Sequence, residues 1–258
     1  MKDLKGKVAL VTGIANKRSI SFAIARELAG WGARLVVTFL PLGKEGEAEK
    51  FAQLTGQLKP AMVLPLDVTD ADSIARLVGE IEKEMGSLGV LVHSMAAAKR
   101  EELRGRFSEI SPEGFLLAQR ISAYSLIALV GATRHLMTGK NSSVITLTFI
   151  GSERAVKNYN VMGSAKAALE SNVRYLAYEL GPEGIRVNAI SAGPIRTVSA
   201  SGIKDFLDLL HMSRSFSALK RTVTMEEVAQ TVSFLASAQS SGITGQVLFV
   251  DGGFNIFG

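Results

Sequence analysis

Tyr159 and Lys166 form the pair of residues in this sequence best suited to chemistry, and they lie seven positions apart in a helix-like segment. Seven helical residues turn through about 700°, so the two side chains lie within ~20° of one face. A phenol can donate a hydrogen bond to a substrate carbonyl, and an ammonium nearby is expected to lower the phenol pKa below about 10. The same spacing is also typical of an ordinary amphipathic helix. The position of the pair in the fold must therefore decide between a catalytic and a purely structural role.

Strand-like apolar runs alternate with helix-length segments along the whole chain. The expected strands are 7–12, 34–39, 62–66, 90–94, 143–148, 186–190 and 246–250, and the expected helices are 20–31, 71–85, 115–137 and 159–180. Continuous apolar strands joined by helical crossovers indicate a parallel sheet covered on both faces. We therefore predict an α/β fold, a single doubly wound (Rossmann) domain over 1–258 with about seven strands. Tyr159 and Lys166 would follow the fifth strand.

The composition of the chain excludes several classes of protein. The 258 residues are 47% hydrophobic and 21% charged, which excludes a disordered chain. The absence of cysteine excludes disulfides and thiolate metal sites, and the three histidines have no ligand spacing, so no metal is expected. The sequence has no signal-peptide pattern and no apolar run of about 18 residues, so we expect a cytoplasmic protein without a membrane. The net charge of +5 is scattered, which speaks against nucleic acid.

The turn after the first strand could bind a pyrophosphate. Residues 8–12 lead into Gly13, and the next helix begins near Ser19, where helix amides in such a sheet bind phosphate. The G-x-G-x-x-G pattern is absent, and an ordinary strand–helix turn would look similar. Asp67, after the third strand, could bind adenine or could cap the helix that starts near Asp70.

The end of the second strand bears on the choice of cofactor. Residues 39–44 offer neither the acid that binds a ribose 2′-hydroxyl nor an adjacent arginine for a 2′-phosphate. Lys44 could approach a phosphate, so NADPH stays open. The lack of a cation directly after the strand favours NADH.

Four blocks of sequence carry a family resemblance: 159–163 with Lys166, 181–197, 200–206 and 250–254. Through them the chain resembles the short-chain dehydrogenase/reductase superfamily and, within it, the bacterial enoyl-acyl carrier protein reductases, over essentially its whole length. Most superfamily members place the lysine four residues after the tyrosine, where this chain has Gly163. The spacing of Lys166 is that of the enoyl reductases and argues against an ordinary ketoreductase.

The resemblance implies reduction of a trans-2-enoyl thioester in fatty acid synthesis, with hydride from NADH, by a homotetramer acting on acyl carrier protein. Tyr159 would hydrogen-bond the thioester oxygen and Lys166 would hold the nicotinamide ribose. The resemblance also implies a cofactor site made of Gly13, Ile14, Ala15, Ser19 and Ile20 at the pyrophosphate, Asp67 and Val68 at the adenine, and Ser94, Met95, Ala96, Ile195 and Thr197 toward the nicotinamide.

For the acyl chain the resemblance implies apolar walls and a covering flap. The flap would span about 199–212, within which 203–212 could form a short amphipathic helix. The substrate residues implied, besides Tyr159, are Ala98, Leu103, Phe149, Met162, Ile203 and Phe206.

Several positions depart from the family pattern. Phe149 stands where many relatives have a second tyrosine, Ala96 replaces a usual glycine, and Leu40 replaces a usual polar residue. On the flap, Lys204 is basic as in relatives, but Leu207 and Asp208 interrupt the basic patch. The alternatives are a reductase of coenzyme A thioesters or another short-chain reductase, a ketoreductase of unusual spacing, and a non-catalytic nucleotide-binding scaffold. The presence of both Tyr159 and Lys166 speaks against the scaffold.

Overall fold

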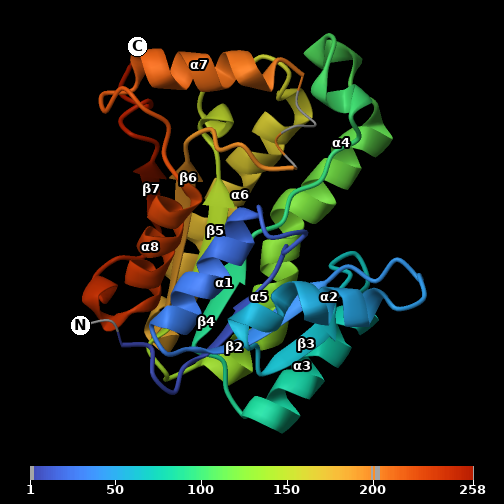
Figure 1. Cartoon of the computed structure of the whole chain (residues 1–258), viewed down its shortest axis with the longest axis vertical. Coiled ribbons are helices and arrows are strands. Elements are labelled where there is room, and N and C mark those ends of the chain that lie inside the picture. The colour runs from blue at the N-terminus through green and yellow to red at the C-terminus, as the bar shows by residue number, and fades with distance from the viewer. Residues whose placement is uncertain (1–2, 199, 201–203, 258) are drawn as a thin grey trace.

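Seven parallel strands form one sheet in the computed structural model, which describes residues 3–198, 200 and 204–257. The strands are β1 (Val8–Val11), β2 (Arg34–Phe39), β3 (Met62–Pro65), β4 (Val90–His93), β5 (Ser142–Thr148), β6 (Ile185–Ala192) and β7 (Val247–Val250). Their order across the sheet is β3-β2-β1-β4-β5-β6-β7 (Figure 1). The predicted doubly wound parallel sheet is confirmed, with strand ends within two residues of those expected.

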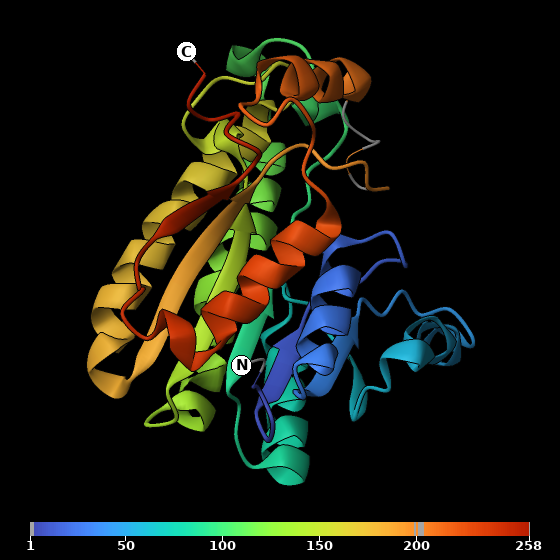
Figure 2. The same cartoon turned by 60° about the vertical axis from the view of Figure 1, so that its left-hand side comes forward.

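Helices cover both faces of the sheet (Figures 1 and 2). They are α1 (Ile20–Gly30), α2 (Glu47–Thr55), α3 (Ala71–Met85), α4 (Pro112–Gln119), α5 (Ser125–Met137), α6 (Asn160–Leu180), α7 (Phe206–Phe216) and α8 (Met225–Ala236). Successive strand residues point to opposite faces: Leu10 packs with the apolar residues of α3, α5 and α6, whereas Val11 packs with those of α1 and α8. This two-sided burial explains why the strands are apolar throughout.

The expected helix over 115–137 is wrong in its start and its continuity. The helical segment begins three residues earlier, at Pro112, because Ser111 caps it by accepting a hydrogen bond from the Gly114 amide at 3.0 Å. A π-helical turn at Arg120–Tyr124 then separates α4 from α5. Within this turn the Ala123 carbonyl accepts from Asn172 on α6 at 3.2 Å. Apolar periodicity by itself does not reveal such a turn.

One helical stretch among the described residues, Pro112–Met137, is long and apolar enough to cross a membrane, with a mean hydropathy of 1.5. Its α5 part contacts α3, α6 and β5, and Leu126 and Leu129 are fully buried in the core. The core helix of a doubly wound fold has the same composition, so the stretch is weak evidence for a membrane.

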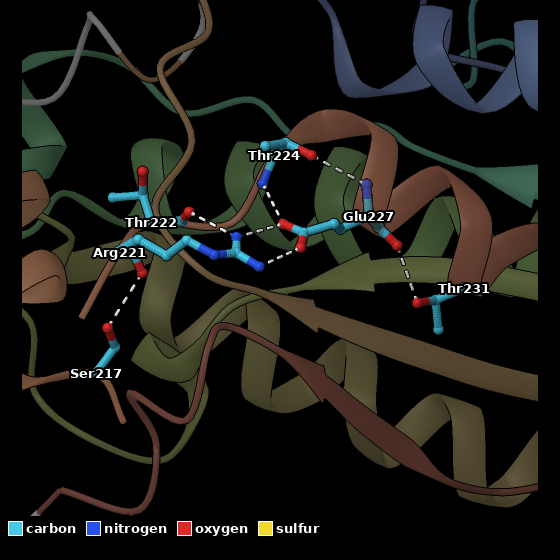
Figure 3. Close-up of polar contacts among 6 residues, drawn as sticks. All are labelled: Ser217, Arg221, Thr222, Thr224, Glu227 and Thr231. Atoms are coloured by element: carbon cyan, nitrogen blue, oxygen red, sulfur yellow. Dashed lines mark hydrogen bonds and ion pairs between the residues drawn. The ribbon is translucent and has the colours of Figure 1, made fainter. Parts of the chain in front are cut away.

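Helix ends follow local capping signals in several places. Helix α3 spans the residues expected, between an Asp70 side chain that accepts from Asp72 and a left-handed Gly86. Helix α8 begins at a capping box in which Thr224 and Glu227 exchange hydrogen bonds (Figure 3). Arg221 pairs with the same glutamate, Nη2 to Oε1 at 2.6 Å.

Other helical segments also differ from the sequence expectation. Helix α2, in which Phe51 and Thr55 are the buried residues, is not among the expected helices because its apolar face is narrow. Helix α7 begins at Phe206 and continues to Phe216, four residues beyond the expected end at 212. Helix α6 begins at Asn160, so Tyr159 is the residue that flanks the helix and not part of it.

Candidate active site

The loop after β1 lies tightly against the end of β4. Gly13 has φ of +80°, and a Cβ atom on it would lie 1.8 Å from the Ser94 carbonyl oxygen. Thr12 joins the same two strands, because its hydroxyl donates to the Val92 carbonyl at 3.0 Å and accepts from the Ser94 amide at 3.3 Å. Only glycine fits at position 13. Two of the predicted cofactor residues, Gly13 and Ser94, therefore lie side by side.

The predicted pyrophosphate residues form a compact turn before α1. Ser19 flanks the helix, and its hydroxyl accepts from the amides of Ala15 at 3.2 Å and Asn16 at 3.0 Å. Ile14 is buried in the core, and Ile20 packs partly against it. The N-terminus of α1, where amide groups point out of the helix, therefore opens beside β1 and β4 at the carboxyl edge of the sheet.

Asp67 does not cap α3, since Asp70 does so. The Asp67 carboxylate instead accepts through Oδ1 from the amide and the hydroxyl of Thr69, at 2.8 and 2.7 Å. Val68 next to it is buried. The structure therefore contradicts the helix-cap interpretation of Asp67, and its role at an adenine stays a prediction.

Tyr159 is only 9% exposed and lies at the entrance to α6. Its ring meets the ring of Phe149 edge-to-face, with centroids 4.9 Å apart. A Cβ atom on Gly151 would lie 2.5 Å from the Tyr159 ring, and one on Gly163 would lie 2.7 Å from the Gly151 carbonyl oxygen. Position 163, where most of the superfamily has its lysine, therefore has no room for a side chain.

A small apolar cluster surrounds Tyr159. Its buried members are Ala118, Tyr159, Val161, Met162 and Ala165, and Ala98, Leu103, Ile110, Phe149 and Val156 pack against them. Five of the seven predicted substrate residues, Tyr159 among them, belong to this cluster, although they come from three separate segments of the chain, 98–103, 149 and 159–162. The structure thus brings them together around the phenol.

Lys166 is buried as well, with 6% of its surface exposed. Its Nζ donates a hydrogen bond of 2.7 Å to the carbonyl of Leu147, two residues before Phe149 on the same chain segment. Tyr159 and Lys166 therefore both contact the end of β5. Burial lowers the pKa of Lys166 to about 8, and the Glu170 carboxylate opposes this shift.

The expectation that Lys166 lowers the pKa of Tyr159 is wrong. Burial raises the pKa of Tyr159 well above its usual value, and the negative charge of Glu170 raises it further. The phenol is consequently neutral at physiological pH. A neutral phenol is a hydrogen-bond donor, which suits a group that binds a developing oxyanion.

His93, at the end of β4, is fully buried. Its ring nitrogens lie 2.8 Å from Thr146 Oγ1 and 2.8 Å from Ser125 Oγ. Burial, followed by the positive charge of Lys166, lowers the pKa of His93 to about 3, so the ring is neutral. His135 lies on the surface, 3.7 Å from Glu82. Within the described ranges, no three histidine or acidic side chains group as metal ligands would.

The remaining predicted residues lie at or near the same edge of the sheet. Met95 and Ala96 follow β4, and Met95 packs against the core. Ile195 and Thr197 follow β6, and Thr197 Oγ1 accepts from the Ala200 amide at 3.0 Å. Phe206 is buried at the start of α7. Ile203 lies outside the described residues, as does part of the predicted flap.

The site contains residues that the sequence interpretation missed. Gly151 allows the close approach of the Tyr159 ring, and Glu170 is buried and accepts from the Thr148 hydroxyl at 2.5 Å. Glu170 lies one helical turn after Lys166, a spacing that could have identified it from sequence. Nothing in the sequence around Gly151 could have done so, because its neighbour Tyr159 meets it only in the fold.

A phenol at the entrance to the helix after the fifth strand of a doubly wound parallel sheet, with a lysine in the first turns of that helix, defines the short-chain dehydrogenase/reductase class. A family model described as enoyl-(acyl carrier protein) reductase matches residues 13–255. The chain is 49% identical to the enoyl-acyl-carrier-protein reductase (NADH) FabI of Nostoc sp. over 258 residues, which covers all of both chains. It is 46% identical to the enoyl-acyl-carrier-protein reductase (NADPH) FabI of Staphylococcus aureus over 255 residues, covering 99% of each.

Solved structures give the same result. The enoyl-acyl carrier protein reductase of Bacillus cereus, in complex with NADP+ and an indole naphthyridinone, superposes with a TM-score of 0.95 at 45% identity, with 100% of each chain covered. The enoyl reductase (NADH) of Aquifex aeolicus gives 0.94 at 41% identity, covering 99% of this chain and 98% of that one. The chain belongs to the family of enoyl-(acyl carrier protein) reductases.

Proposed function

We propose that this protein reduces the carbon–carbon double bond of a trans-2-enoyl thioester carried on acyl carrier protein, with NADH, in fatty acid synthesis. The observation that carries the proposal is the placement of Tyr159, which is buried and neutral in an apolar cluster next to the end of β5. Lys166 donates a hydrogen bond to Leu147 at the same end of the strand. The membership in the enoyl reductase family and the full-length similarity to its relatives support the same activity.

The residues present fit a nicotinamide dinucleotide. The left-handed Gly13 brings the turn before α1 against the end of β4, so helix amides and the Ser94 segment border one edge of the sheet. Thr69 engages Oδ1 of Asp67, and among the described residues Oδ2 has no hydrogen-bond donor, so Oδ2 can accept from an adenine amino group. When bound, the reduced nicotinamide supplies the hydride.

The protein's own residues act on the thioester. Tyr159 donates a hydrogen bond to the thioester oxygen and stabilises the negative charge that develops there as C3 is reduced, an effect typically worth about 3 kcal/mol. The walls of Phe149 and Met162 exclude water and so strengthen that hydrogen bond. Lys166 holds the ribose hydroxyls and keeps the ring oriented. A proton from solvent or a relay completes the product at C2.

Assembly and location form part of the proposal. The adjacent α4–α5 and α6 segments expose large apolar or aromatic side chains: Leu116, Tyr124, Ile127, Tyr175 and Tyr178. Exposed apolar patches of this kind favour burial against another protein. We infer that they are covered by copies of the same chain in a cytoplasmic homotetramer.

The activity is tested by the loss of reduced-nicotinamide absorbance with purified protein. NADH and NADPH are each combined with a crotonyl thioester on acyl carrier protein, with crotonyl-coenzyme A and with an acetoacetyl thioester. The fastest turnover is expected for NADH with the crotonyl carrier protein. Faster reduction of the acetoacetyl thioester would identify a ketoreductase, and binding of NADH without turnover of any thioester would identify a scaffold.

A further inference from the structure

Thr148, at the end of β5, forms a buried polar contact with α6 that the proposed mechanism does not use. Its hydroxyl donates to Glu170 Oε1 at 2.5 Å, and Glu170 is 6% exposed. The residue before Thr148 on the strand, Leu147, accepts from Lys166. Two consecutive strand residues therefore bind two α6 side chains one helical turn apart.

A buried carboxylate is costly unless a counter-charge is near. Glu170 and Lys166 lie on the same face of α6, because side chains four residues apart are neighbours on a helix. Lys166 donates to a neutral carbonyl and Glu170 accepts from a neutral hydroxyl, so neither hydrogen bond neutralises the charge of the side chain that makes it. The attraction of Glu170 counteracts the effect of burial on the pKa of Lys166.

The other titratable groups beside Lys166 do not compete for this role. His93 on β4 is neutral, because its pKa lies near 3, and it contributes no charge. Tyr159 is neutral as well, because burial raises its pKa. Among the titratable groups of the described residues that act on Lys166, Glu170 is the one that supplies negative charge.

We propose that Glu170 is a positioning residue, whose carboxylate keeps Lys166 charged and directed toward the ribose of the bound dinucleotide. The proposal rests on the ribose-binding role proposed for Lys166. It assigns the effect to the charge of Glu170 and not to its hydrogen bond with Thr148, and the two can be separated by substitution.

Glu170→Gln removes the charge but keeps an oxygen that can accept from Thr148, whereas Thr148→Val removes the hydrogen bond and keeps the charge. NADH binding, followed by reduced-nicotinamide fluorescence from pH 6 to 9.5, should weaken as the pH rises through about 8, the pKa of Lys166. In Glu170→Gln the midpoint should move to lower pH, while binding at pH 6 stays close to that of the unsubstituted protein. A midpoint one unit lower leaves about a tenth of the lysines charged at pH 8, a roughly fivefold loss of affinity.

Glu179→Gln is the matched control, because Glu179 lies on the same helix but at the surface, 3.8 Å from Arg134. In Glu179→Gln and in Thr148→Val, the pH midpoint of NADH binding should equal that of the unsubstituted protein. An unmoved midpoint in Glu170→Gln, or an equal shift in Thr148→Val, would overturn the proposal. If Glu170→Gln does not fold, Glu170→Asp is the test. Its carboxylate lies farther from Lys166, so the pH midpoint should fall by a smaller amount. An unchanged midpoint would overturn the proposal.

Failure of the underlying mechanism gives a different result. If Lys166→Ala binds NADH as the unsubstituted protein does at every pH, the role of Lys166 is wrong. If Lys166→Ala weakens binding and Glu170→Gln leaves the midpoint in place, only the role of Glu170 is wrong.

Discussion

The environment of Tyr159 determines which chemistry its phenol can do. The ring lies in an apolar cluster against Phe149, and burial together with Glu170 raises its pKa. The group is thus a hydrogen-bond donor in its resting form and not a ready base. Phe149 puts an apolar ring at the position where the family resemblance expects a second tyrosine, so among the described members of the cluster Tyr159 alone supplies an aromatic hydroxyl.

Replacing Tyr159 by Phe should lower turnover about 100-fold, since one donor to a developing oxyanion is typically worth this much. NADH affinity should change little, because the phenol is expected to contact the thioester. Lys166→Ala should show the opposite pattern, with NADH affinity as the larger loss. Steady-state kinetics and NADH titration measure both, and undiminished turnover in Tyr159→Phe would refute the assignment.

At the scale of elements, the approach of β5 to α6 builds the site. The short 3-10 turn Ile150–Ser152 after β5 lies so close to α6 that a Cβ atom on Gly163 would lie 2.7 Å from the Gly151 carbonyl oxygen. This close contact displaces the lysine from position 163 and allows the Tyr159 ring to cover Gly151. A backbone oxygen cannot move aside as a flexible side chain can.

Gly163→Ala should therefore destabilise the protein by about 1–3 kcal/mol, through overpacking against that oxygen, and should lower turnover. Gly79→Ala is the matched control, because Gly79 is also inside a helix but has nothing within 4 Å of its virtual Cβ. That variant should be more stable by about 0.5–1 kcal/mol, through helix propensity alone. Thermal unfolding measures the stability of both variants. Equal changes in stability for Gly163→Ala and Gly79→Ala would contradict the close contact at Gly163.

The start of α8 depends on a local signal that is independent of the site. Thr224→Ala removes the hydroxyl of the capping box and should cost about 1 kcal/mol (Figure 3). Thr231→Ala is the control in the same helix, because the Thr231 hydroxyl donates only to the Glu227 carbonyl within the helix. This substitution should change stability by less than about 0.5 kcal/mol. Melting temperatures test the difference, and both variants should reduce enoyl thioesters at the same rate.

At the scale of the whole molecule, burial is uneven. The two faces of the sheet are closed by helices, yet α6 exposes Tyr175 and Tyr178, at 76% and 89%. The stretch Pro112–Met137, which has the composition of a membrane span, also exposes apolar side chains, among them Leu116 and Ile127. Burial of this surface in the proposed homotetramer would account for that composition without a bilayer.

Tyr178→Glu should shift the protein to smaller assemblies, because a carboxylate buried in an apolar interface is unfavourable. Leu42→Glu is the control, since Leu42 is also exposed, at 62%, but lies in the loop after β2. Sedimentation equilibrium gives the masses. A monomeric unsubstituted protein, or an unaltered mass in Tyr178→Glu, would show that copies of the chain do not cover this face.

Local sequence patterns suffice to predict the sheet and the pair Tyr159 and Lys166 beside the end of β5. Apolar runs of strand length, spaced by helical periodicity, lead to seven parallel strands, because each strand must be buried on both faces. The spacing of Tyr159 and Lys166 puts both near one end of α6. The π-helical turn, α2 and the true start of α4 escape such patterns, since they depend on single capping residues and on contacts with other segments.

Tertiary structure alone decided how these side chains behave. Tyr159 and four other predicted substrate residues meet in one cluster because three separate segments converge there, and no spacing along the chain encodes that. The pKa values of Tyr159 and Lys166 depend on how much water the packed chain excludes and on the buried Glu170. The direction expected for the Tyr159 pKa was wrong for this reason: a neighbouring charge can be identified along a helix, but desolvation exists only once the whole chain has closed around the group.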